Sequence, residues 1–557
     1  MKRFFSLLLV CMFMLSLLYS CGFTEDNATD NADVKKEQWV KAQNTPFGKY
    51  PETVTYTLGK QTSTNNSNMP EGDTYENNAY TRYLLEKLNI QNENVFEEMD
   101  DEYNTAVSMA IAMGDIPDIM VVNNYNDLIR MVKMGLVADL TDSYKNCASS
   151  SIKSMYNSYG DELLDSVTFD GKIMAIPETN IEEGPNLIWL RKDWMDDLGL
   201  REPKTLEDVE YIISKFLEAD SQRVGLVITS SLCGESGYSS QYITDIIFAN
   251  FGAYPKQWIE NDEGEIVYGS VQPEAKTALE HIHQLYKTGI IDRDFLFRST
   301  NDIIDLIESG RCGSFFGPWW SPNNPLMNMV ANNPEADWQP YLISTDDDGV
   351  TRYHSTNPTN YKYVVVRKDF EHPEIAWKII SVLFDYARYQ DKEGVSEVAE
   401  YDKNAVDPTA RPLVINVDYS NALSLCYKHI KAVFDGKKEL ADLNFMERSY
   451  AEQCLDYINS GNQYTTEQWA AYVSRISACR LISQDNVEEV KTYFFSDTPT
   501  MDTGWWRLKE LENNAYLRIV TGQADISYFD TFVEEWGKQG GLTITREVNE
   551  SLKRNED

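Results

Sequence analysis

Hydrophobic positions along the chain alternate between short apolar runs and stripes with helical spacing. The run Ile119–Val122 predicts a buried strand, and the apolar residues from Leu128 to Leu136 after it recur at helical spacing, with Asn126 as the predicted cap. The same alternation returns further on, with strand-like runs at 225–229, 313–316 and 361–366 and helical stripes at 206–217, 275–286, 303–307 and 376–384. This pattern predicts an α/β fold with largely parallel sheets, followed from Asp418 by a mostly helical segment.

The N-terminus has the pattern of a secretory signal. Lys2 and Arg3 precede the apolar run Phe4–Tyr19, which is shorter than the ~20 residues of a membrane span, so residues 1–20 are predicted to be a signal peptide. The run ends in Leu-Tyr-Ser-Cys, which resembles the lipobox at which bacterial lipoproteins are cleaved and acylated on the cysteine, here Cys21. The alternative is an ordinary signal peptide that happens to end at a cysteine. Two acyl chains hold a protein stably on a membrane.

Composition narrows the function of the 557-residue chain. Residues 21–47 are polar and acidic without an apolar period, which predicts a disordered tether. Lysine and arginine number 50 against 88 acidic residues, a net charge of −38 that argues against binding to nucleic acid or to anionic lipid. Six cysteines remain beyond Cys11 and Cys21, at wide spacings and without a C-x-x-C pair, so we expect mostly buried free thiols.

Catalytic and metal-binding patterns are weak. His281 and His283 lie two positions apart, on different sides of a helix, and Ser236 lacks the second glycine of a nucleophile elbow. The run Asp346–Gly349 is expected to be a solvated acidic turn rather than a calcium loop. Carboxylate pairs carry no information without geometry in a chain with so many acids. We therefore predict a protein that is not an enzyme and needs no cofactor or metal.

Residues that follow predicted strands are the candidate ligand contacts, because ligands of open α/β sheets bind outside the carboxyl ends of the strands. Two such segments are Asn123-Asn124-Tyr125 and Gly317-Pro318-Trp319-Trp320. Tryptophan rings stack on sugars, although Trp is also highly buried on average. Adjacent rings cannot easily point the same way, so we expect one of Trp319 and Trp320 in the cleft and the other in the core.

Several motifs in order give the chain a family resemblance. It resembles the large solute-binding lipoproteins of bacterial ABC importers (family 1), in the oligosaccharide-binding group of the alginate-binding proteins and the LplA-type lipoproteins. The resemblance covers nearly all of residues 50–550, and its motifs are Gly114–Ile119, Gly135–Leu140, Asp170–Pro177, Leu190–Met195, Gly317–Trp320, His372–Glu374, Phe529–Val533 and Gly540–Gly541. Each motif is weak alone, but their order and spacing are specific.

The resemblance implies a two-lobed, class II periplasmic-binding-protein-like α/β fold. We expect an N-terminal lobe of residues 48–183 and 345–425 and a second lobe of 184–344 and 426–557, with hinge crossings near Glu178–Leu187 and Ser344–Tyr353. The expected function is that of a monomeric, lipid-anchored binding protein on the outer face of the cell membrane. It would capture an oligosaccharide between the lobes and deliver it to the permease subunits of an ABC importer. The candidate ligand contacts are Trp319, Trp320, Asn123, Asn124, Tyr125, Glu178, Trp189, Arg191, Tyr238 and His354.

Two alternatives stay open at this point. One is a surface-anchored polysaccharide-degrading enzyme, which would need two carboxylates at fixed separation, and the other is a binder of peptides or other solutes on the same fold. Relatives often carry a calcium loop between the helix after the Arg-Lys-Asp-Trp segment and the next strand. Here that place, Glu218–Gly225, has few oxygen ligands and contains Arg223, so the resemblance does not extend to calcium.

Overall fold

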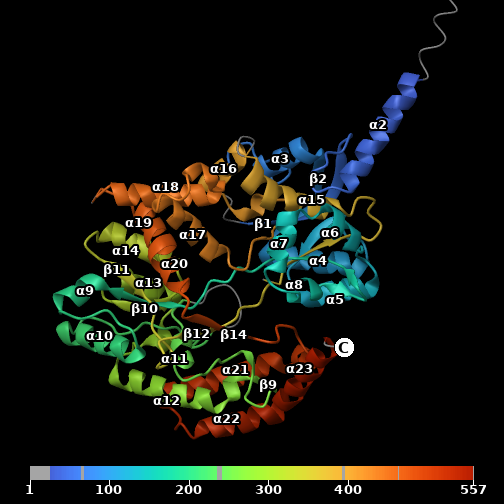
Figure 1. Ribbon diagram of the computed structural model, residues 1–557. Helices are drawn as coiled ribbons and strands as arrows, with labels where there is room; N and C mark the ends of the chain where they lie inside the picture. Colours follow the sequence, from blue (N-terminus) through green and yellow to red (C-terminus); the bar gives the residue numbers. More distant parts are fainter. Residues whose placement is uncertain are drawn as a thin grey trace, which may run out of the picture. The chain divides into compact units, whose positions relative to one another are not determined.

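The computed structural model describes residues 26–63, 68–234, 241–359, 361–391, 395–404, 406–461 and 463–555 (Figure 1). The chain divides into two compact units. Unit 1 comprises Met1–Glu178 and Tyr361–Val417, and unit 2 comprises Thr179–Asn360 and Asp418–Asp557. The predicted signal peptide, Cys21 and Tyr238 lie outside the described residues.

The boundaries between the units differ from the predicted lobe boundaries. The largest difference concerns the second crossing, which was expected near Ser344–Tyr353 and falls at Asn360 instead. The reason is a long-range pairing: strand β12 (Thr351–His354) pairs in parallel with β14 (Val487–Val490), which is also part of unit 2. The partner strand is too distant in sequence to be predicted from hydrophobic pattern.

Unit 1 is built on a five-stranded sheet with the order β2-β1-β3-β13-β6. Strands β1 (Val54–Thr62), β2 (Ile90–Met99) and β3 (Ile119–Val122) run parallel, whereas β13 (Tyr363–Val366) is antiparallel to both β3 and β6 (Ile176–Pro177). The predicted strands at 119–122 and 361–366 are thus confirmed as β3 and β13. All four residues of each are buried, as their continuous apolar runs require.

Helices and one small hairpin complete unit 1. The hairpin of β4 (Thr168–Phe169) and β5 (Lys172–Ile173) turns at Gly171, whose φ of 73° suits glycine. The longer helices are α2 (Asp26–Gln43), α3 (Ala79–Leu88), α4 (Asp100–Met113) and α5 (Tyr125–Met134). The shorter ones are α6 (Thr141–Cys147), α7 (Ser150–Asn157), α8 (Glu162–Asp165), α15 (Ile375–Ser381), which continues into a π-helical turn (Val382–Gln390), and α16 (Ser396–Lys403).

Part of the predicted tether is folded, which corrects the prediction of disorder over 21–47. Residues 26–43 form helix α2, and its last turn packs into unit 1: Ala42 is fully buried and the Trp39 ring stacks on His372 at 5.5 Å. The buried Lys378 ammonium then holds the following loop by donating to the carbonyls of Ala42, Thr45 and Gly48 at 2.7–2.8 Å. The segment is mostly polar and shows no apolar period, so these few contacts could not be predicted from the sequence.

The central sheet of unit 2 is antiparallel, which corrects the prediction of largely parallel sheets. Strand β7 (Leu187–Arg191) lies between β10 (Ser314–Gly317) and β11 (Trp338–Tyr341) and is antiparallel to both. A hairpin of β8 (Trp258–Glu260) and β9 (Ile266–Tyr268) is also antiparallel. The predicted strand over 225–229 forms only isolated bridges at Val224, Leu226 and Val227, all of them parallel.

Many helices surround this sheet, and most of the predicted ones are present. The first group contains α9 (Lys192–Asp197), α10 (Leu206–Ala219), α11 (Asp245–Ala249), α12 (Pro273–Thr288), α13 (Thr300–Glu308) and α14 (Met327–Asn332). The helical segment expected after Asp418 is confirmed as α17 (Ala422–Phe434), α18 (Phe445–Asn459), α19 (Thr466–Tyr472), α20 (Cys479–Ile482), α21 (Met501–Val520), α22 (Tyr528–Trp536) and α23 (Leu542–Asn555). Figure 1 shows α21 and α22 beside α12.

Capping residues explain where several helices begin. Thr205 caps α10 through a reciprocal capping box with Asp208, as predicted. The cap of α5 is Asn124 rather than Asn126, because Asn124 is extended and its side-chain oxygen accepts the Asp127 N–H at 2.8 Å. The six predicted thiols are free and buried. None of the described helices is both long and apolar enough to cross a membrane.

Candidate ligand-binding pocket

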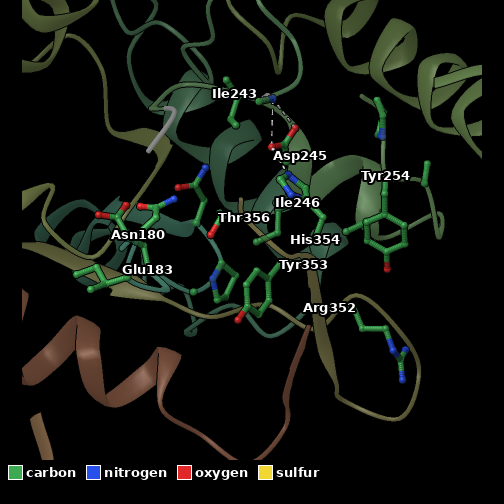
Figure 2. A pocket seen from close by; sticks show the side chains of 18 residues that line it. Asn180, Glu183, Ile243, Asp245, Ile246, Tyr254, Arg352, Tyr353, His354 and Thr356 are labelled. Atoms are coloured by element: carbon green, nitrogen blue, oxygen red, sulfur yellow. Dashed lines mark hydrogen bonds and ion pairs between the residues drawn. The ribbon is translucent and has the colours of Figure 1, made fainter. Parts of the chain in front are cut away.

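A pocket in unit 2 brings together residues from four separate segments. The empty space in and at the mouth of the pocket is about 840 Å³, part of which is open solvent. Its lining comes from the loop 180–186, from Gly234 together with Ile243 and helix α11 (Asp245–Ala249), from 253–255, and from the end of β12 with the loop after it. Figure 2 shows Asn180 and Glu183 on one side, Tyr254 and Arg352 on the other, and His354 and Tyr353 between them.

Backbone pairing fixes the two segments that carry most of the polar groups. The Asn180 N–H donates to the Pro358 carbonyl and its side-chain amide to the Asn357 carbonyl, both at 2.8 Å. The parallel pairing of β12 with β14 places His354 at the end of its strand. The loop 180–186 is therefore held beside the loop that follows β12, so both segments face the same space.

Helix α11 contributes the carboxylate of Asp245, which contacts both Gly234 and His354. Asp245 accepts the backbone N–H of Gly234 with both oxygens, at 3.0 and 3.2 Å. The same carboxylate lies 3.4 Å from Nε2 of His354, whose Nδ1 is 3.1 Å from the Ser355 carbonyl oxygen. Burial alone would lower the pKa of His354, but the hydrogen bond and negative charge of Asp245 outweigh it, so the pKa of His354 is raised.

Two consecutive glutamates on the loop 180–186, Glu182 and Glu183, are largely desolvated. Burial raises the pKa of Glu183 to about 7, an effect that the neighbouring Trp320 indole opposes. Burial also raises the pKa of Glu182 to about 7, and the nearby Glu489 carboxylate adds to the rise. Of the two, Glu183 lines the pocket. Desolvated carboxyls of this kind gather at functional sites, where a ligand replaces the missing water.

The remaining walls are apolar and aromatic. Ile181, Pro185, Ile243, Ile246 and Ala249 supply apolar surface, and Tyr254 and Tyr353 supply rings. Planar amide and carboxylate groups next to apolar and aromatic surface form a typical small-molecule site. This combination suits a ligand with many hydroxyls and flat apolar faces, because hydroxyls pair with the planar groups and the faces stack on rings.

The described residues offer no metal site. Nowhere in the part of the chain that the structure describes do three His, Cys, Asp or Glu side chains gather in a geometry that could hold a metal ion. At the position of the calcium loop, Asp220 accepts the Gln222 N–H at 2.9 Å, and the Arg223 guanidinium covers the Trp194 ring at 3.6 Å. A donor set with an arginine in its middle does not fit calcium.

Of the predicted contacts, His354 lines this pocket. Three others in unit 2 are built into the protein interior. Trp189 is fully buried on β7, where its indole donates to the Gly317 carbonyl at 3.1 Å, and Arg191 is buried and paired with Asp193. Trp319 is 7% exposed in the hydrophobic core, under the Arg475 guanidinium at 4.5 Å. These contacts give Trp189, Arg191 and Trp319 structural roles, and their part in ligand binding stays a prediction. Trp320 is partly buried beside Glu183 and stays a candidate.

Four predicted contacts lie in unit 1 and not in the pocket. Asn123 donates to Asn104 at 3.0 Å, Asn124 caps α5, and Tyr125 donates to the Ser166 carbonyl at 2.8 Å. Glu178 is buried and accepts the Asn416 N–H at 2.8 Å. These contacts give each side chain a structural role, and their part in ligand binding stays a prediction.

Several pocket residues escaped prediction, chiefly Asn180, Glu183, Asp245 and Tyr353. They lie in coil or in elements of five residues or fewer, which leave no periodic pattern in the sequence. One signal was present: residues 178–187 were predicted to form a crossing between lobes, and the lining loop 180–186 lies within that range.

Comparison with known proteins identifies the family. The family of bacterial extracellular solute-binding proteins matches residues 85–392, more than half of the chain. The protein belongs to this family, which confirms the resemblance found in its sequence motifs.

Individual relatives are distant but cover most of the chain. The polygalacturonan/rhamnogalacturonan-binding protein YtcQ of Bacillus subtilis is 21% identical over 80% of this chain and 83% of its own. The lipoprotein LipO of Bacillus subtilis is 25% identical over 81% of this chain and 84% of its own. Among solved structures, the alginate-binding protein AlgQ2, crystallised without calcium ion, matches 92% of this chain and 99% of its own with a TM-score of 0.57 and 14% identity. This similarity confirms the two-lobed solute-binding fold.

Proposed function

We propose that the protein captures an oligosaccharide outside the cytoplasm and delivers it to an ABC importer. The observation that carries the proposal is the pocket of unit 2, in which Asn180, Glu183, Asp245 and His354 face one space beside the rings of Tyr254 and Tyr353. Sugars bind through hydroxyls that pair with planar polar groups and through ring faces that stack on aromatics. Two similar proteins, the polygalacturonan/rhamnogalacturonan-binding protein YtcQ and the alginate-binding protein AlgQ2, support the same ligand class.

The proposal includes a lipid anchor at Cys21 and a monomeric state. Support for the anchor comes from the apolar run Phe4–Tyr19, which ends shortly before Cys21, and from LipO, a relative named as a lipoprotein. Binding between two lobes stays a prediction from the sequence. So does the absence of turnover, for which the membership in a binding-protein family is the argument.

A thermal-shift screen tests the proposal. The chain from Gly22 onward, which keeps helix α2 and lacks the anchor cysteine, is heated with neutral and acidic oligosaccharides. A ligand at 100 times its dissociation constant adds roughly 2.7 kcal/mol to the free energy of unfolding, enough to raise the melting temperature visibly. We expect at least one oligosaccharide to do so without release of reducing sugar.

Two results would contradict the proposal. If no oligosaccharide stabilises the protein while a peptide mixture does, the ligand class is wrong. If reducing ends accumulate with time, the protein is a polysaccharide-degrading enzyme, and the two pocket carboxylates Glu183 and Asp245 become the residues to mutate first.

A further inference from the structure

The charges around the pocket indicate which oligosaccharides it accepts. Resting on the proposed function, we infer that this pocket selects an uncharged oligosaccharide and rejects one that carries uronic acid carboxylates. The inference depends on how the two cationic side chains of the lining, Arg352 and His354, are paired with acids, and on the further negative charge that Glu183 brings to the lining.

Carboxylates dominate the polar lining. Glu183 and Asp245 line the pocket directly, and Glu182 adjoins Glu183 on the same loop. Glu489 of β14 is close enough to Glu182 to disfavour its ionised form. Two acids thus line the pocket and two more lie beside that lining, while two lining residues, Arg352 and His354, carry or can gain positive charge.

Arg352 is held by acids on the outer side of the pocket. Its guanidinium pairs with Asp346 of the preceding loop and with Glu488 of β14, the latter at 3.0 Å. Figure 2 shows the Arg352 side chain pointing away from Asp245 and His354. One guanidinium shared by two carboxylates leaves a net negative group, so Arg352 does not provide a free cation for a ligand.

His354 is neutralised in the same way. Its Nε2 lies 3.4 Å from Asp245, so a protonated imidazole and that carboxylate together carry no net charge. A neutral imidazole leaves Asp245 unbalanced. In both protonation states the ionised Glu183 adds a further negative charge, and the lining is never net positive.

Neighbouring residues do not supply the missing cation. Lys256 follows the lining residue Pro255 but is not part of the lining. Its ammonium donates to the Cys233 carbonyl at 3.0 Å, which leaves its charge in place outside the groups that line the pocket. The segment 235–240, outside the described residues, contains one acid and no Lys, Arg or His.

These charges favour hydroxyls over carboxylates as ligand groups. Sugar hydroxyls can donate to Glu183 and Asp245, which satisfies both acceptors inside the pocket. A uronate would instead place its carboxylate against them without the bidentate guanidinium that carboxylates usually receive. Like charges brought together in a binding site weaken binding strongly. The pocket thus differs from what the names of YtcQ and AlgQ2 suggest, since polygalacturonan and alginate consist of uronic acids.

Matched sugar pairs test the inference by isothermal titration calorimetry near pH 8. Each uronate oligosaccharide is paired with its methyl ester, and each neutral oligosaccharide with the form whose primary hydroxyls are oxidised to carboxylates. Within the pair that binds most tightly, we expect the uncharged member to bind at least about 10-fold more tightly. Glu183→Gln and Asp245→Asn should each reduce this preference several-fold, whereas Glu263→Gln, on an exposed turn outside the pocket, should leave it unchanged.

The outcomes separate the two proposals. Equal or tighter binding of the charged member overturns the inference and leaves the proposed function in place. An undiminished preference in both folded pocket variants also overturns it, because the selectivity then arises elsewhere. If no sugar of either kind binds, the proposed function fails and the inference falls with it.

Discussion

Lys378 in unit 1 and Glu183 in unit 2 are both ionisable groups held away from water, and they differ in their hydrogen-bond partners and surroundings. Lys378 donates to three backbone carbonyls at 2.7–2.8 Å, so its full donor capacity is used. Glu183 lines an open pocket, and burial raises its pKa to about 7. Burial also lowers the pKa of Lys378 to about 8, so both groups are desolvated and the difference lies in their surroundings. We infer that a buried charge whose donors are all taken by the backbone stabilises the fold, whereas a desolvated carboxyl that lines an open pocket marks a place for a ligand.

The largest expected effect on stability comes from replacing Lys378. Lys378→Met leaves three buried carbonyls without their donor and loosens the loop after α2, so we expect a loss of about 3–5 kcal/mol in the free energy of unfolding. Urea denaturation measures this loss. The exposed Lys133→Met on α5 is the matched control and should change stability by less than about 0.5 kcal/mol. Equal effects of the two substitutions would show that Lys378 does not fasten this loop.

The second prediction concerns the pH dependence of stability that Glu182 and Glu183 cause. The folded-state pKa values of Glu182 and Glu183, about 7, lie above those of unfolded glutamate, so both bind protons more readily in the folded state. Their contribution to stability is therefore full below about pH 4.5 and lost as the pH rises through about 7. His354, with a raised pKa, acts in the same direction, while Lys60 and Lys378, whose pKa values are lowered, act in the opposite one.

A variant isolates the two glutamates from the other groups. Between pH 8 and pH 6 the wild type should gain on the order of 1–3 kcal/mol more stability than the double variant Glu182→Gln with Glu183→Gln, measured by urea denaturation at each pH. The same gain in both proteins would mean that neither carboxyl has a raised pKa in the folded state.

The smallest expected effect concerns calcium. Because Arg223 lies over Trp194 where the family resemblance would place a calcium loop, removal of divalent cations should leave the melting temperature within about 1 °C. Scanning fluorimetry with a chelator, and then with excess calcium, measures this. A calcium-dependent rise of several degrees would show a site that the described residues do not reveal.

Sequence patterns predicted the elements well where local chemistry decides the structure. The continuous apolar run Ile119–Val122 is a buried strand, and the Thr205–Asp208 capping box starts α10. Sequence patterns did not predict structure that depends on contacts between segments far apart in the sequence. The antiparallel sheet around β7 depends on strands more than a hundred residues away, and Trp189 is buried in a core cluster with Phe315 of β10 and Trp338 of β11.

The pocket was predicted least well, for a related reason. His354 was named, but its partner Asp245 lies 109 residues earlier on a five-residue helix that leaves no periodic pattern. Glu183 and Asn180 lie in coil, and hydrogen bonds from Asn180 to the loop after β12 hold their segment at the pocket. Contacts of this kind are set by the fold and cannot be seen in local sequence.

The most direct test of the account is the affinity of pocket variants for the tightest oligosaccharide of the screen. Isothermal titration calorimetry compares the wild type with Asp245→Ala and Tyr353→Ala, using Glu263→Gln as the control. We predict that at least one pocket variant binds about 30-fold more weakly or worse while its melting temperature without ligand stays near that of the wild type. Unchanged affinity in both folded variants would contradict the claim that this pocket of unit 2 holds the ligand.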